Sequence, residues 1–82
     1  MDEIDHAGRV PVYVQLAGIL RGQIERGELP PDRPLPSKVI LQERYRLSQG
    51  SVERAINVLR QEGLVETVVG KGIYVLPPEE RP

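Results

Sequence analysis

Short polar side chains gather between Ser48 and Glu53, in a stretch that also contains Gly50. Gln49 can pair bidentately with adenine, and Glu53 can accept a hydrogen bond from the amino group of cytosine. Ser48 and Ser51 can hydrogen-bond to phosphates, and the glycine would let the backbone approach closely. These residue types favour hydrogen bonding to nucleic acid. In the plain alternative, the two serines only cap a helix and Gln49 is solvated.

A second group of candidate contacts is cationic. The tripeptide Gly70-Lys71-Gly72 would hold a lysine at a hairpin tip, where it could contact phosphate or the minor groove. A plain surface turn has the same composition, so the tripeptide alone is weak evidence. The arginines that flank the polar cluster could anchor phosphates, or they could be solvated or paired with acidic side chains: Arg44, Arg46 and Arg54.

Apolar periodicity predicts the helices that would position these residues. A first helix can begin at Pro11 and end at Gly27, because apolar residues between them mark one helical face. That face consists of Tyr13, Leu16, Ala17, Leu20 and Ile24. Ser37 is the predicted N-cap of a second helix over residues 38–45. The expected buried stripe of the second helix consists of Ile40, Leu41 and Tyr45.

A third helix is predicted over about 49–62, with Ser48 as its N-cap and Gly63 as its end. Its core side consists of Val52, Ala55, Ile56 and Leu59. Residues 64–69 and 73–76 are rich in β-branched and aromatic side chains around a glycine-bracketed turn, which is typical of a β-hairpin. The predicted fold class is therefore mainly α with a small β-hairpin wing. This is a winged helix-turn-helix with a three-helix core and a two-stranded wing.

This order of elements indicates binding to double-stranded DNA. A helix with a polar N-terminus fits the major groove, and a basic hairpin beside it can reach the backbone or the minor groove. We expect the DNA-binding domain to span residues 10–76. A flexible tail over residues 1–9 would precede it, and a linker or tail over residues 77–82 would follow it.

Composition limits the class of protein. The 82 residues suit one small domain, and the absence of cysteine excludes disulfides and thiolate metal sites. The sequence shows neither a membrane-spanning run nor a signal peptide, so we expect a cytoplasmic protein without a membrane partner. The net charge of −1 is unusual for a nucleic-acid binder. However, residues 9–76 hold ten basic and seven acidic side chains, an excess of three positive charges that permits DNA binding.

Enzymatic chemistry is not expected. The single histidine, His6, lies in the predicted tail, so the sequence offers no positioned acid–base pair, no nucleophile–histidine arrangement and no set of metal ligands. A phosphate-cradling glycine motif is also missing, since the wing glycines precede a strand rather than a helix. We therefore expect no cofactor and no metal.

The assembled residues resemble the N-terminal DNA-binding domain of the GntR family of bacterial transcription regulators. The resemblance is carried, in order, by PVYVQLAGILRGQIERGEL, LPS, LSQGSVERAINVLRQEGLV and GKGIYV. These stretches cover nearly the whole chain from Val10 to Val75. The resemblance implies a winged helix that binds a palindromic operator as a homodimer and usually represses transcription.

Carried over position by position, the resemblance implies DNA contacts from the start of the second helix, the N-terminal half of the third helix and the wing. Ser37 holds the place of the serine in the family's LPS motif, and Arg54 matches a frequent arginine. The implied residues are Ser37, Lys38, Ser48, Gln49, Gly50, Ser51, Glu53, Arg54, Gly70, Lys71 and Gly72.

The departures from the family pattern concern charge. Val39, Gln49 and Glu53 stand where arginines are common, and Lys38 stands where an acidic residue is usual. A changed DNA specificity follows if Gln49 and Glu53 read bases. Loss of DNA binding is the alternative, because Glu53 near a phosphate would be repelled. The chain would then be a protein-interaction module that has kept the winged-helix fold.

Family members also carry a C-terminal domain that senses a metabolite and dimerises. This chain ends at Pro82, where that domain would begin. We therefore expect no effector-binding domain in this chain. It is either an excised DNA-binding domain or a free-standing small regulator.

Overall fold

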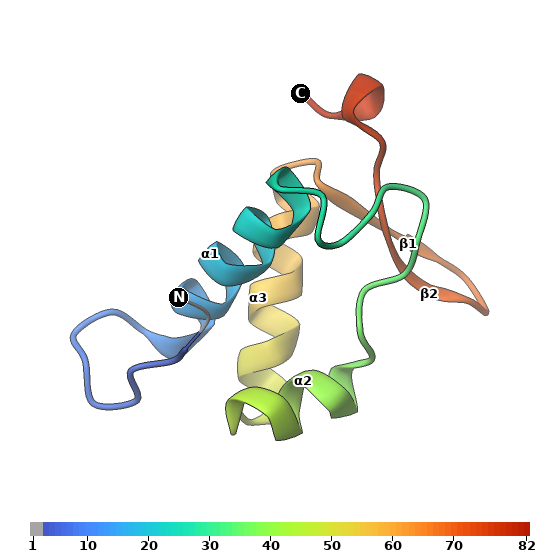
Figure 1. Ribbon diagram of the computed structural model, residues 1–82. Helices are drawn as coiled ribbons and strands as arrows, with labels where there is room; N and C mark the ends of the chain where they lie inside the picture. The colour runs from blue at the N-terminus through green and yellow to red at the C-terminus, as the bar shows by residue number, and fades with distance from the viewer. Residues whose placement is uncertain (1–2) are drawn as a thin grey trace.

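The computed structural model describes residues 3–82, which form a winged helix-turn-helix as predicted (Figure 1). Three α-helices come first, α1 (Val12–Glu25), α2 (Lys38–Tyr45) and α3 (Gln49–Gln61). The antiparallel strands β1 (Val65–Val68) and β2 (Gly72–Val75) form the wing, and a short 3-10 turn, η1 (Pro78–Glu80), follows. None of the helices in this described part is long and apolar enough to cross a bilayer.

The core lies where α3 packs against α1, α2 and the first strand of the wing. Each helix contributes the residues that recur at helical spacing on one face, because only that face can be withdrawn from water. The core cluster consists of Leu16, Ala17, Leu20, Ile24, Leu35, Leu41, Tyr45, Leu47, Val52, Ala55, Ile56, Leu59, Val65 and Val75. Four of these residues come from α3, so the opposite face of α3 is left for solvent or a ligand.

Serine side chains cap the second and third helices, as the sequence predicts. The Ser37 hydroxyl accepts a hydrogen bond from the backbone N–H of Ile40, and the Ser48 hydroxyl accepts one from the backbone N–H of Ser51, both at 3.2 Å. Between the two helices, Arg46 takes a left-handed conformation with φ of 58°. That residue makes the turn tight enough for α3 to begin three residues later.

The buried stripe predicted for α2 is wrong at one position. Leu41 is 0% and Tyr45 is 7% exposed, whereas Ile40 is 45% exposed. At about 100° per residue, Leu41 and Tyr45 lie 40° apart around the helix axis, but Ile40 lies roughly 140° from Tyr45. A helix of eight residues meets the core along a narrow stripe, and Ile40 lies outside it.

The wing is a short hairpin with Val65 opposite Val75 and Val68 opposite Gly72. β1 is one residue shorter at each end than the predicted range 64–69, and β2 begins and ends one residue earlier than the predicted range 73–76. The proline-rich segment before α2 lies along β2. There Leu35 N–H donates to the carbonyl of Ile73 at 2.8 Å, and Val75 N–H donates to that of Arg33 at 3.0 Å. β2 is thus hydrogen-bonded along both edges, to β1 on one side and to residues 33–35 on the other.

The segment before α1 contacts the helices. Asp5 and Gln15 exchange two hydrogen bonds, from Asp5 N–H to Gln15 Oε1 at 2.8 Å and from Gln15 Nε2 to the Asp5 carbonyl at 2.9 Å. His6 Nε2 lies 3.1 Å from the carbonyl oxygen of Tyr45 at the end of α2. Residues 1–2 of the expected tail lie outside the described residues. The flexibility expected for residues 1–9 stays a prediction.

Candidate nucleic-acid interface

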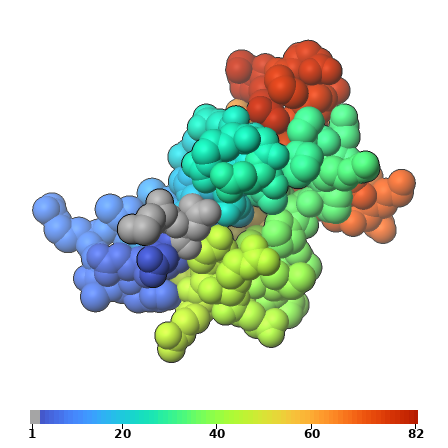
Figure 2. Space-filling view, viewed as in Figure 1, coloured from blue at the N-terminus to red at the C-terminus, as the bar shows by residue number. Residues whose placement is uncertain are grey.

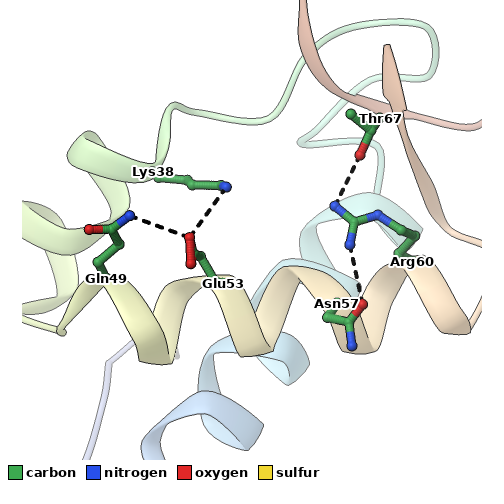
Figure 3. A network of polar contacts seen from close by, with 6 residues as sticks. All are labelled: Lys38, Gln49, Glu53, Asn57, Arg60 and Thr67. Atoms are coloured by element: carbon green, nitrogen blue, oxygen red, sulfur yellow. Dashed lines mark hydrogen bonds and ion pairs between the residues drawn. The ribbon is translucent and has the colours of Figure 1, made fainter. Parts of the chain in front are cut away.

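The face of α3 that turns away from the core carries polar side chains at a spacing of four residues. Gln49, Glu53 and Asn57 follow one another along this face, and all three are exposed. Figure 3 shows them on one side of α3, with Arg60 completing the row towards the wing. In Figure 2, α1, α2 and the segment between them hide most of α3 from view, while the wing protrudes at the edge.

The first half of this face forms a polar network with the start of α2. Glu53 Oε1 accepts a hydrogen bond from Gln49 Nε2 at 3.3 Å. The same oxygen lies 3.8 Å from the ammonium of Lys38, the first residue of α2 (Figure 3). The negative charge of Glu53 is therefore balanced within the fold. The structure brings together three of the predicted site residues, although they come from two helices.

The second half of the face connects α3 to the wing. Arg60 donates from Nη1 to Asn57 Oδ1 at 3.2 Å and from Nη2 to Thr67 Oγ1 on β1 at 3.0 Å (Figure 3). These three residues were not among the site residues predicted from the sequence. The available signal was the spacing of four residues, which continues from Gln49 and Glu53 to Asn57.

The start of α3 holds the serines and the glycine of the predicted cluster. Ser48 caps the helix and also donates its hydroxyl proton to Ser51 Oγ at 3.1 Å. The capping alternative for Ser48 is therefore present in the structure. It leaves open a contact with a phosphate, because a hydroxyl oxygen can take part in more than one hydrogen bond. Gly50 is exposed, and a Cβ atom there would meet nothing within 4 Å.

Arg54 contacts an aromatic ring on α1. Its guanidinium carbon lies 5.6 Å from the centre of the Tyr13 ring on α1, which is cation–π geometry. The side chain nevertheless borders a hollow of about 430 Å³ on the exposed face of α3. This hollow is lined by Lys38, Gly50, Glu53, Arg54, Ile56, Asn57 and Arg60.

The predicted wing tip lies beside a second hollow, of about 560 Å³, between the hairpin and the start of α2. Both wing glycines take positive φ, 81° for Gly70 and 132° for Gly72, so the turn exposes Lys71 between them. Ser37 and Lys38 border the second hollow together with the tripeptide 70–72. Because Lys38 borders both hollows, the two form one continuous surface.

One acidic side chain near the end of α3 is engaged elsewhere. Arg21 on α1 donates two hydrogen bonds to the carboxylate of Glu62, each at 2.8 Å. The hydrogen bonds and the negative charge of Glu62 raise the pKa of Arg21. This pair ties α1 to the end of α3 and takes Glu62 away from the arginines that flank the polar cluster.

Acidic and histidine side chains do not gather into a metal site anywhere in residues 3–82. The candidate surface consists of hydrogen-bonding side chains, backbone amides at two helix starts and the cations Lys38, Arg54, Arg60 and Lys71. Such a surface can bind an anion and discriminate between hydrogen-bonding patterns.

Comparison with known proteins identifies relatives of this chain. The chain is 37% identical over 76 residues to "HTH-type transcriptional repressor NagR" of Bacillus subtilis, covering 93% of this chain and 31% of the relative. It is 39% identical over 74 residues to "Mannosyl-D-glycerate transport/metabolism system repressor MngR" of Escherichia coli, covering 90% and 30%. The chain thus spans less than a third of these relatives.

One solved structure of similar fold is a complex with operator DNA. The AraR DNA-binding domain in complex with operator ORX1 superposes with a TM-score of 0.81 at 27% identity, covering 89% of this chain and 94% of that one. The family model described as bacterial regulatory proteins, gntR family, matches residues 12–75. This family consists of regulatory proteins, which confirms the expectation that the chain is not an enzyme. The chain belongs to the gntR family of bacterial regulatory proteins.

Proposed function

We propose that this domain binds double-stranded DNA in a sequence-specific manner and serves as the DNA-reading part of a transcriptional regulator, in most such proteins a repressor. The observation that carries the proposal is the polar face of α3, which is exposed and adjoins the wing. A helix of this kind fits the major groove. The likeness to a domain solved on its operator, and to relatives named as repressors, supports the proposal.

In the proposed complex, α3 lies in the major groove and Gln49, Ser51 and Glu53 read base edges. Lys71 on the wing contacts the backbone or the minor groove. The remaining residues bind phosphates or allow close approach, which positions the domain without reading sequence. They are Ser37, Ser48, Gly50, Arg54, Gly70 and Gly72. Lys38 contributes a positive charge beside Glu53.

We further propose that two copies bind a palindromic operator in the cytoplasm. One domain reads only a few base pairs, so a symmetric dimer would double the length of DNA that is recognised. The excess positive charge of residues 9–76 is small, and the gain in affinity from a second copy would compensate for it.

Selection of bound duplexes from a random DNA pool at low salt tests the proposal. We expect enrichment of one motif, with a matching inverted half-site if two copies bind together. Gln49→Ala should relax the preference at one base position and leave the rest of the motif unchanged. A pool that stays random after repeated selection would contradict sequence-specific binding.

A further inference from the structure

We infer that the ion pair between Lys38 and Glu53 reads a single C·G base pair as a unit. The inference rests on the proposed function, because it requires α3 to lie in the major groove. It concerns which base pair is recognised and assigns base reading to Lys38. The starting point is the distance of 3.8 Å between Lys38 Nζ and Glu53 Oε1 on the exposed surface.

The pair presents an acceptor and a donor side by side. In the major groove, a C·G pair shows the cytosine N4 amino group as a donor next to the O6 and N7 acceptors of guanine. A carboxylate oxygen fits the amino group, and an ammonium with three N–H donors can serve O6 and N7 together. The two charged groups of Lys38 and Glu53 therefore match the two halves of this edge.

An A·T pair fits the same two groups less well. Its single donor, the adenine N6 amino group, lies between the acceptors N7 and O4, which would both repel a carboxylate. The thymine methyl group next to O4 would also obstruct an ammonium. The ion pair thus discriminates through charge as well as through hydrogen bonding.

The surrounding contacts orient Glu53 for this role. Gln49 Nε2 and Lys38 Nζ both engage Oε1, so among residues 3–82 the contacts of the carboxylate converge on one oxygen. This arrangement leaves Oε2 to accept from a ligand. It also answers the electrostatic objection to an acidic residue near DNA, because Lys38 compensates the charge that phosphates would repel.

Selection from a random DNA pool with four proteins tests the inference: the unmodified domain, E53Q, K38M and the charge-reversed double variant K38E/E53K. Both side chains are more than 40% exposed, so we expect all four proteins to fold, which circular dichroism verifies. The unmodified domain should enrich C·G at one position. E53Q and K38M should each reduce that preference by about tenfold, the size expected for one base contact.

The double variant is the matched control, because it keeps the net charge and the ion pair while exchanging donor and acceptor. It should enrich G·C in place of C·G at the same position. Motifs of the variants that equal that of the unmodified domain at every position would overturn the inference and leave the proposed function intact. Absence of any motif for the unmodified domain would overturn both.

Discussion

The guanidinium of Arg60 on α3 donates a hydrogen bond of 3.0 Å to the hydroxyl of Thr67 on β1. The same guanidinium donates to Asn57 at 3.2 Å, so its plane is held between the helix and the wing. The hairpin also packs on α3 through β1 and is hydrogen-bonded to residues 33–35 along β2. The bond from Arg60 to Thr67 adds a side-chain link that helps to orient the wing relative to the exposed face of α3.

Thr67→Val should loosen the wing while keeping the shape and β-propensity of the side chain. We expect the affinity for all DNA sequences to fall by less than about tenfold, because the wing must then be ordered on binding. The free energy of unfolding should change by less than about 1.5 kcal/mol, since the bond is exposed to solvent. Fluorescence anisotropy titrations and urea denaturation measure the two effects.

Thr67→Ser is the control for this substitution, because it keeps the hydroxyl that accepts from Arg60. It should bind DNA more tightly than the valine variant. Equal affinities for the serine and valine variants would show that the bond does not position the wing.

Helix boundaries and the hairpin were predictable from the sequence because their determinants are local. Ser37 and Ser48 accept bonds from amides three residues ahead, and the apolar repeats of α1 and α3 lie within single helices. Contacts between elements were harder to predict from the sequence. Pairing of residues 33–35 with β2 could not be predicted, because the three prolines of residues 29–34 indicate only a connector between two helices.

In the candidate site, too, features within one helix could be predicted from the sequence, whereas contacts between elements could not. The exposed position of Gln49 and Glu53 follows from helical periodicity within α3. The contact of Glu53 with Lys38 joins residues 15 positions apart in the chain and depends on the angle between α2 and α3, which no local pattern encodes. The bond from Arg60 to Thr67 similarly depends on how the wing folds back against α3.

Lys71→Ala should lower the affinity for specific and random DNA alike. The lysine is exposed at the wing tip, where it would neutralise one phosphate without reading a base. We expect the slope of log affinity against log salt to decrease in magnitude by about one. Lys71→Arg keeps the charge and should retain the original slope. An alanine variant with an unchanged slope would place the wing tip away from DNA.

Substitutions at Ser48 should separate folding from DNA binding. Ser48→Ala removes the cap of α3 and should lower the free energy of unfolding by about 1 kcal/mol. Ser48→Asp restores the cap, because a carboxylate accepts from the same amide and suits the helix N-terminus. The same carboxylate would repel a phosphate at the helix start, so we expect a loss in DNA affinity of more than about tenfold.

Thermal denaturation and anisotropy titration of the Ser48 variants compare these effects. Ser37→Asp, at the cap of α2, serves as a second acidic cap on the same surface. If Ser48→Asp bound DNA as tightly as the unmodified domain, the start of α3 would lie away from phosphates. That result would count against the proposed orientation of α3.

Gly63→Ala tests the end of α3, where Gly63 N–H donates to the Arg60 carbonyl and Leu64 N–H to that of Leu59. Gly63 has a φ of 77°, so alanine should cost about 1–2 kcal/mol of the free energy of unfolding in urea. An added Cβ would also lie 2.7 Å from Pro82 Cδ. Gly27→Ala is the matched control, because its φ is 80° and a Cβ there meets nothing within 4 Å. Gly63→Ala should lower the free energy of unfolding more than Gly27→Ala does. Adding Pro82→Gly to Gly63→Ala should remove the difference. Equal losses from the two single substitutions would mean that the C-terminal segment moves to make room for the new side chain.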